Sequence, residues 1–198
     1  MNTAEDRQLV RQIKQGRKDA FRVLVERYKQ PLYYYCYRLC RNHSDAEDLS
    51  QEVFIKVFQN IEQFREEAKM LTWIYRIAAN AFIDKKRKKV VSLVETDNPQ
   101  TQTELDTAVM QSQREEMNPE YQAESTLIQK HIDTAMRKLS DKEKTAFILK
   151  HYEGLAIKEI ADIFKTSEGT VKSHLFRAVK KLQKSLSFYR NELGLEES

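Results

Sequence analysis

The chain has 198 residues and a formal net charge of +4, with only 4 glycines and 3 prolines. Glycine and proline punctuate strands and tight turns, so their scarcity beside plentiful Leu, Ala, Glu, Lys and Gln favours an all-α fold and argues against a parallel sheet. No apolar run approaches the roughly 20 residues that a membrane span requires, so we expect a cytoplasmic protein without direct membrane insertion. The length allows one medium domain or two small ones.

Charge divides the chain into three parts. Residues 1–90 carry a net charge of +7, residues 91–122 carry −6, and residues 123–198 carry +3. The middle part holds two of the prolines and no sustained apolar period, which is typical of a flexible acidic linker. We therefore expect two small helical domains, at 5–90 and 123–188, joined by a linker at 91–122.

The segment 19–41 is strongly apolar and aromatic, which predicts one or two buried helices, interrupted or kinked at Pro31. Cys36, Cys40 and His43 are close together in this region. A metal site built on them needs a fourth ligand that is not evident, so two reduced, partly buried thiols are the favoured interpretation. We expect no metal and no cofactor.

An acidic helix follows. Ser44 and Glu47 form the pattern of a capping box, which predicts a helix beginning at about Asp45. One face of this helix is apolar. The opposite face gathers polar and acidic side chains, which are Asp45, Asp48, Gln51 and Glu52. Taken alone, this face is either simply solvated or a surface for a protein partner.

The next helical segment combines aromatic and basic residues and ends in the basic run Lys85 to Lys89. On a helical wheel Trp73, Arg76 and Asn80 share one face. Rings that stack on bases, cations that follow phosphates and an amide that reads a base edge together describe a single-strand binding surface. Two alternatives stay open: Trp73 could be a core residue, and the basic run could be a frayed, solvated helix end.

Residues 157–182 predict a helix, a polar turn and a second helix with Ser167 as its N-cap. Val171, Leu175, Ala178 and Leu182 form a core-facing stripe on the second helix. The opposite face carries an aromatic ring among cations and a hydroxyl, as a helix in a DNA major groove does. The alternative is a solvated cationic face. These outward residues are Lys172, Ser173, Phe176, Arg177 and Lys180.

Three stretches in this order resemble a known family: DAEDLSQEVFIKVFQNIEQF, TWIYRIAANAFIDKKRKK and LSDKEKTAFILKHYEGLAIKEIADIFKTSEGTVKSHLFRAVKKL. They are similar to bacterial sigma factors of the sigma-70 class, in the short extracytoplasmic-function (ECF) group, over residues 7–90 and 123–186. The resemblance implies a protein that is not an enzyme. It would bind core RNA polymerase and direct promoter-specific transcription initiation.

The resemblance also assigns partners and roles to positions of this chain. The acidic face of Asp45, Asp48, Gln51 and Glu52 would dock on the β′ clamp helices, with the β flap as a second polymerase contact. The minus-10 element would be opened and held by Lys56, Phe64, Trp73, Tyr75, Arg76, Asn80, Lys85, Lys86 and Arg87. The minus-35 element would be read by Thr170, Lys172, Ser173, Phe176, Arg177 and Lys180. Promoter DNA and an anti-sigma factor are the other implied partners.

The chain departs from the family pattern at three places. The loop from Phe64 to Ala68 lacks the usual Phe-Arg-Gly-Asp/Glu-Ser sequence, which leaves the base preference at minus-10 open. Lys165 stands where glycine is frequent, so this position either avoids a positive φ or accepts strain. His174 replaces a common arginine, which predicts one weaker phosphate contact at neutral pH.

Two other classes of function remain to be compared. A stand-alone helix-turn-helix regulator would leave the acidic helix and the aromatic, basic face without a role. Binding of duplex promoter DNA by the chain alone discriminates the two, because a regulator binds it and a free sigma factor of this type does so poorly. A nucleic-acid enzyme is disfavoured because the sequence offers no Gly-rich phosphate loop and no cluster of metal-ligating carboxylates.

Overall fold

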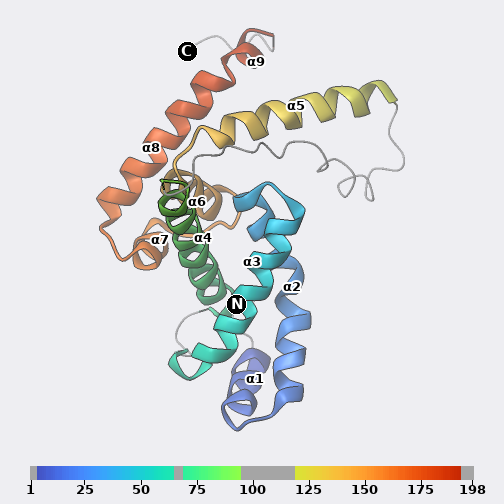
Figure 1. Ribbon diagram of the computed structural model, residues 1–198, viewed down its shortest axis with the longest axis vertical. Helices are drawn as coiled ribbons and strands as arrows, with labels where there is room; N and C mark the ends of the chain where they lie inside the picture. Colours follow the sequence, from blue (N-terminus) through green and yellow to red (C-terminus); the bar gives the residue numbers. More distant parts are fainter. Residues whose placement is uncertain (1–3, 65–68, 95–118, 193–198) are drawn as a thin grey trace.

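The computed structural model describes residues 4–64, 69–94 and 119–192, and all regular structure in these ranges is helical. This confirms the all-α expectation. The N-terminal helices are α1 (Ala4–Lys14), α2 (Lys18–Cys40), α3 (His43–Asn60), the 3₁₀ turn η1 (Ile61–Gln63) and α4 (Met70–Val94). The C-terminal helices are α5 (Pro119–Arg137), α6 (Asp141–His151), α7 (Ile157–Phe164), α8 (Glu168–Ser185) and α9 (Ser187–Glu192) (Figure 1). Most of the expected linker, 95–118, lies outside the described residues.

The N-terminal helices form a bundle in which α2 packs against α1, α3 and α4. Leu24 and Leu32 are buried in its core on either side of Pro31. Helix α2 runs without a break from Lys18 to Cys40, so of the expected alternatives the single helix is correct and an interruption at Pro31 is wrong. A proline inside a helix removes one backbone hydrogen bond, and burial of the apolar face on both sides of it holds the two halves in one helix.

Helix α3 begins two residues earlier than the sequence predicts. Its N-cap is Asn42, whose backbone is extended and whose Oδ1 accepts a hydrogen bond from the Asp45 N–H at 2.9 Å. Ser44 already lies inside the first turn, so it is not the cap. Asn and Ser are about equally good caps, and the turn that follows α2 decides between them by leaving Asn42 extended.

The C-terminal helices contain the expected helix-turn-helix. Ser167 caps α8, its Oγ accepting from the Thr170 N–H at 3.1 Å. Lys165 ends α7 in the left-handed region, with φ 51°, and its N–H donates to the carbonyls of Ala161 and Asp162. Of the two alternatives at Lys165, the chain takes the positive φ.

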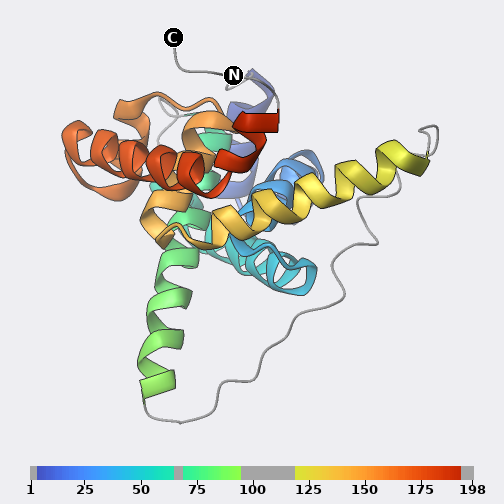
Figure 2. The same cartoon turned by 90° about the horizontal axis from the view of Figure 1, so that it is seen from above.

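The two sets of helices pack on each other. Helix α4 contacts α6 and α7, and α2 contacts α6, so one apolar core runs through both (Figure 2). Glu153, in the turn between α6 and α7, accepts a hydrogen bond from Arg38 Nη1 of α2 at 3.0 Å, and its side chain is only 10% exposed. Burial, and then the Glu153 carboxylate, raise the pKa of Tyr75 on α4. A second ion pair joins Arg41 to Asp133 of α5.

Within the C-terminal helices, Glu143 ties α6 to α8. Its Oε2 accepts from the Ser140 N–H at 2.9 Å, completing a capping box, and from Lys181 Nζ at 2.7 Å. Its Oε1 accepts from Arg177 Nε at 3.2 Å. Burial alone would raise the pKa of this carboxyl, but the hydrogen bonds from Lys181 and Ser140 outweigh it and lower the pKa from 4.5 to about 2.

This shifted pKa predicts how stability depends on pH. Because the folded pKa of Glu143 is depressed, its contribution to the free energy of unfolding is complete above pH 4.5 and is lost as pH falls toward 2. We expect the difference in unfolding free energy between the wild type and Glu143→Gln to shrink over that interval. Urea titrations of both proteins at pH 7, 4 and 2.5 measure it. A difference that is the same at every pH contradicts the ion pairs described.

The conformation of Lys165 predicts a stabilising substitution. A side chain with a Cβ costs roughly 1 kcal/mol in the left-handed region, and glycine avoids this cost while losing part of the gain to its greater freedom when unfolded. Lys165→Gly should therefore raise the free energy of unfolding by about 0.5 to 1 kcal/mol. Lys165→Ala is the matched control, because it removes the same side chain but keeps the Cβ. Equal stability of the two variants would argue against the strain.

Candidate nucleic-acid interface

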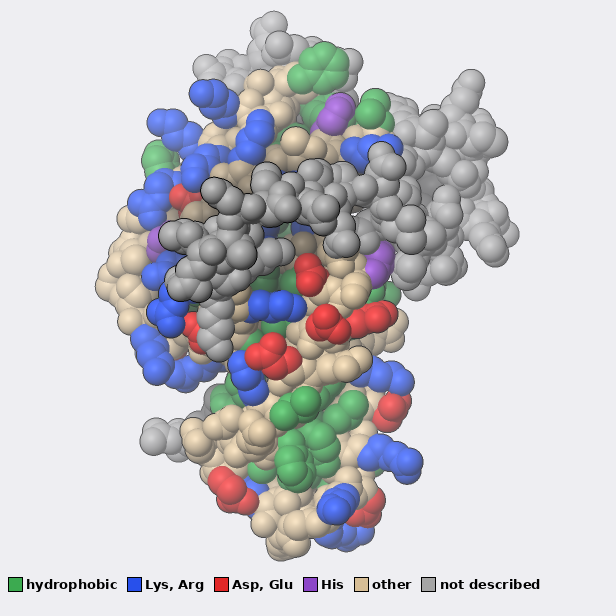
Figure 3. Space-filling model, viewed as in Figure 1, with side chains coloured by type: hydrophobic (Ala, Val, Ile, Leu, Met, Phe, Trp, Pro, Cys, Tyr) green, Lys and Arg blue, Asp and Glu red, His purple; other side chains and the backbone are tan. Residues whose placement is uncertain are grey.

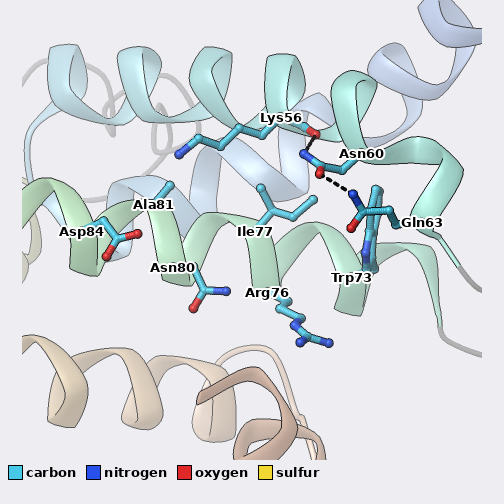
Figure 4. Close-up of a pocket in the computed structure, with 9 residues that line it drawn as sticks. All are labelled: Lys56, Asn60, Gln63, Trp73, Arg76, Ile77, Asn80, Ala81 and Asp84. Atoms are coloured by element: carbon cyan, nitrogen blue, oxygen red, sulfur yellow. Dashed lines mark hydrogen bonds between the residues drawn. The ribbon is translucent and has the colours of Figure 1, made fainter. Parts of the chain in front are cut away.

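A pocket of about 330 Å³ lies between α3 and α4 (Figure 4). Helix α3 and η1 supply one wall and α4 supplies the other. Three of the sequence-predicted residues on α4, Trp73, Arg76 and Asn80, come together here with Lys56 of α3. The remaining lining residues are Asn60, Gln63, Ile77, Ala81 and Asp84.

The lining side chains divide into those held by internal contacts and those left available. Asn60 Nδ2 donates to the Lys56 carbonyl at 2.8 Å and its Oδ1 accepts from Gln63 Nε2 at 3.1 Å, so these amides stabilise the end of α3. Trp73 is half-buried, its ring 5.1 Å from that of Phe64. Asn80 is exposed, and its side chain makes no hydrogen bond to any other described residue. An available amide beside a half-open indole suits an unpaired base.

Two rings expected at this surface lie elsewhere. Phe64 and Tyr75 are each 3% exposed and belong to the core. The Tyr75 ring packs against Tyr35 with their centroids 4.6 Å apart. A ring that is packed on both faces has no surface left for a base, so we remove Phe64 and Tyr75 from the candidate DNA contacts. Trp73 packs against the core but is only half-buried, so it stays in the candidate set.

The basic run continues α4 beyond the pocket. The helix extends to Val94, so the run is helical, not a frayed end. Lys85 Nζ lies 3.7 Å from Asp45 Oδ1, Lys86 lies 5.8 Å from the centre of the Phe82 ring, and Arg87 is exposed. The helix thus carries three cations just beyond the pocket.

The outer face of α3 carries the predicted acidic set. Asp45, Asp48 and Gln51 are exposed, and Glu52 is half-exposed in an ion pair with Lys56 at 2.7 Å. Asp48 has no ion-pair partner among the described residues.

The same face becomes apolar toward the end of α3, which the sequence reasoning missed. Ile55 is 58% exposed and Phe58 is 50% exposed, and the Phe58 ring contacts that of Phe21 on α2. Figure 3 shows apolar side chains gathered over α2 and α3, below a group of acidic ones. Continuing the helical period from Asp48 and Gln51 would have found both residues. Apolar groups beside charged ones are typical of a protein-binding surface.

Helix α8 presents its predicted outer face. Val171 and Ala178 are fully buried, and they fix the rotation of the helix, while Phe176 on the opposite side is 69% exposed. Lys172 and Lys180 are exposed. The two hydroxyls are engaged within the helix: Thr170 Oγ1 bonds to Ser167 Oγ at 2.9 Å, and Ser173 Oγ donates to the Gly169 carbonyl at 3.0 Å.

Arg177 differs from the expected freely projecting side chain. Its Nε donates to Glu143 and its Nη2 lies 3.0 Å from Nδ1 of His174. Burial, then the charges of Arg177 and Lys142, lower the pKa of His174 below 6.5. His174 is therefore neutral at pH 7, and its Nδ1 is able to accept the bond from Arg177.

The described residues contain no group of three or more side chains able to hold a metal ion, and Cys36 and Cys40 are both free. Burial raises the pKa of both thiols, to about 11 for Cys40. In the same part of the chain no helix is both long and apolar enough to cross a membrane.

Comparison with known proteins gives two domain matches. Residues 24–90 match Sigma-70 region 2 and residues 130–182 match Sigma-70, region 4. The chain is 37% identical to the ECF RNA polymerase sigma factor SigW of Bacillus subtilis over 177 residues. The aligned region covers 89% of this chain and 94% of SigW. The chain is 30% identical over 186 residues to the RNA polymerase sigma-H factor of Pseudomonas aeruginosa, covering 92% and 94%.

Solved structures show the same fold. The sigma factor RpoE of Bartonella quintana, crystallised with the anti-sigma factor NepR, superposes with a TM-score of 0.66 at 23% identity over 84% of this chain and 96% of that one. CnrH, in complex with the cytosolic domain of CnrY, gives a TM-score of 0.59 at 18% identity over 92% and 97%. With two regions matched in order and similarity to SigW along nearly its whole length, the chain belongs to the ECF group of the sigma-70 family of RNA polymerase sigma factors.

Proposed function

We propose that this protein binds core RNA polymerase and directs it to promoters by holding the minus-10 element at α4 and the minus-35 element at α8. The observation that carries the proposal is the pocket between α3 and α4, where an indole, a guanidinium and an amide meet at one opening. The single strand of the melted minus-10 element binds at the pocket residues Lys56, Trp73, Arg76 and Asn80. Lys85, Lys86 and Arg87 follow the phosphates.

Holding a melted strand requires binding energy and no covalent chemistry. Each base stacked on an aromatic ring gains about 1 to 3 kcal/mol, which offsets the loss of stacking in the duplex. The Trp73 indole provides this platform, and the Asn80 amide has both donors and an acceptor for a base edge. The protein therefore acts as a binding and positioning subunit, and the polymerase makes the phosphodiester bonds.

Helix α8 reads the minus-35 element in the major groove. The exposed Phe176 ring suits a thymine methyl group, and Lys172 and Arg177 suit a guanine edge or a phosphate. Lys180 lies farther along the helix, where we propose that it contacts the DNA phosphate backbone. Thr170 and Ser173 donate or share their hydroxyl protons within the helix, which leaves oxygen lone pairs for contacts with DNA.

The outer face of α3 binds the polymerase. Asp45, Asp48, Gln51 and Glu52 meet the β′ clamp helices, and the C-terminal helices meet the β flap. The apolar end of this face, Ile55 and Phe58, supports the assignment because it supplies area that loses water on binding. Two cations of the DNA-binding surface, Lys56 and Lys85, pair with acids of this face, so the two surfaces adjoin.

An anti-sigma factor is the other partner that we propose. One protein of similar fold was crystallised with an anti-sigma factor, and the structure of another was solved in complex with the cytosolic domain of its partner. In this chain α6 and α7 already pack on α4. An anti-sigma factor would need only to stabilise this closed arrangement. Because its proposed partner is RNA polymerase, we place this protein in the cytoplasm.

The polymerase interface is tested by charge reversal on and off this face. Asp48→Lys places a cation on the outer face of α3, so it should weaken binding to core polymerase at least tenfold with an unchanged melting temperature. Glu26→Lys makes the same change of charge at an exposed position of α2, outside the acidic set, and should bind normally. Titration of labelled core polymerase measures both. Equal affinity of the two variants would remove Asp48 from the interface.

Promoter opening is tested at the available amide. Asn80→Ala removes no internal hydrogen bond of the described structure, so stability should stay within about 0.5 kcal/mol of the wild type. The holoenzyme should still form closed complexes, while permanganate reactivity of thymines near minus-10 falls and about 1 to 3 kcal/mol of base discrimination is lost. Gln8→Ala, an exposed amide of α1 outside the pocket lining and outside the outer face of α3, is the matched control.

The result also separates the two classes of function. A stand-alone regulator binds promoter duplex without polymerase and has no permanganate signal to lose. If the free chain binds the duplex as tightly as the holoenzyme does, or if Asn80→Ala opens promoters normally, the proposed role of α4 is wrong.

A further inference from the structure

Arg177, which we propose contacts the minus-35 element, is hydrogen-bonded to a buried carboxylate of a neighbouring helix. Its Nε donates to Oε1 of Glu143, a carboxylate that is 5% exposed, while the Arg177 side chain itself is 52% exposed. The buried acid and the exposed base belong to different helices, α6 and α8, 34 positions apart in the chain. The contact therefore fixes a surface side chain to the domain interior.

The geometry leaves the outward part of the guanidinium available. An arginine has five N–H donors in a rigid fork. One is used by Glu143 and another by Nδ1 of His174, at 3.0 Å. The other donors, which include both of Nη1, have no partner among the described residues. Because Nε and Nη2 are both held, the direction in which Nη1 points is set before DNA binds. Less rotamer entropy of the Arg177 side chain is then lost on binding.

We propose that Glu143 is a positioning residue for promoter recognition, which orients the Arg177 fork toward a pair of acceptors on a guanine edge of the minus-35 element. The inference rests on the proposed function of α8 and deepens it. Glu143 does not touch DNA; it acts through Arg177. A freely rotating arginine or lysine would suffice for a phosphate, whereas two acceptors on one base edge require a fork of fixed direction.

The two carboxylate oxygens of Glu143 have separate tasks, which makes the proposal testable. Oε2 serves the fold, accepting from the Ser140 N–H and from Lys181. Oε1 has Arg177 Nε as its partner among the described residues. In Glu143→Gln the amide oxygen takes the place of Oε2, because glutamine also completes a capping box. The amide NH₂ then faces the Arg177 N–H, donor against donor, so this variant keeps the cap and releases the fork.

The experiment transcribes a promoter library, with all four bases at every minus-35 position, using holoenzyme made from the full chain. The variants are Arg177→Ala, Glu143→Gln, the double variant, and Lys181→Gln as a matched control that removes the other cation from Glu143. Arg177→Ala should relax preference at one minus-35 position about tenfold. Glu143→Gln should relax the same position about three- to tenfold, and the double variant no further than Arg177→Ala. Lys181→Gln should keep the preference.

Each other outcome has a defined meaning. If Arg177→Ala changes preference at no position, the proposed reading by Arg177 fails and the inference falls with it. If Arg177→Ala relaxes one position and Glu143→Gln does not, the reading stands and the positioning role is overturned. A uniform loss at all positions with a lower melting temperature would show a structural role only, and also overturns it. Glu143→Asp, which keeps the charge but shortens the side chain, gives an intermediate loss at the same position and serves if the glutamine variant unfolds.

Discussion

Each proposed binding surface of this protein depends on one constraint, which is that the apolar stripe of a helix fixes its rotation. On α4, Ile74 and Ala78 are completely buried, and this turns Arg76 and Asn80 into the pocket. On α8, Val171 does the same for Phe176. A helix repeats every 3.6 residues, so the burial of one face determines which side chains the other face presents.

Surface ion pairs connect the outer face of α3 with the proposed DNA-binding surface. The pairs Lys56–Glu52 and Lys85–Asp45 lie at the surface, where such pairs contribute about 0.2 to 1 kcal/mol. Phosphates or a protein partner can replace either member at small cost. Glu143 is different, because it is buried among its hydrogen bonds and stays ionised at any pH above its lowered pKa. The protein thus combines exchangeable ion pairs at the surface with more firmly held ones around buried carboxylates such as Glu143.

Composition predicts the fold class, helical period predicts the main faces of α3, α4 and α8, and residue type predicts the cap at Ser167. It fails where a helix is covered on two sides or where partners are distant in sequence. Tyr75 shares a helix with the pocket residues but is packed between Tyr35 and the Glu153 turn, which no wheel of α4 alone contains. The tie from Arg177 to Glu143 crosses between helices, so the sequence shows two charges without their contact. Asn42 was missed because an equally good cap stood two residues away.

The packing of α6 and α7 on α4 has a thermodynamic consequence for anything that binds α4. A partner that requires the two sets of helices to be apart encounters only the fraction of molecules that are open, and its apparent dissociation constant is the intrinsic one divided by that fraction. If closure were favoured by about 1.4 kcal/mol, about one molecule in ten would be open and affinity would fall about tenfold. Arg38 and Glu153 are not among the proposed DNA contacts, yet through this equilibrium their ion pair bears on how tightly a promoter is held.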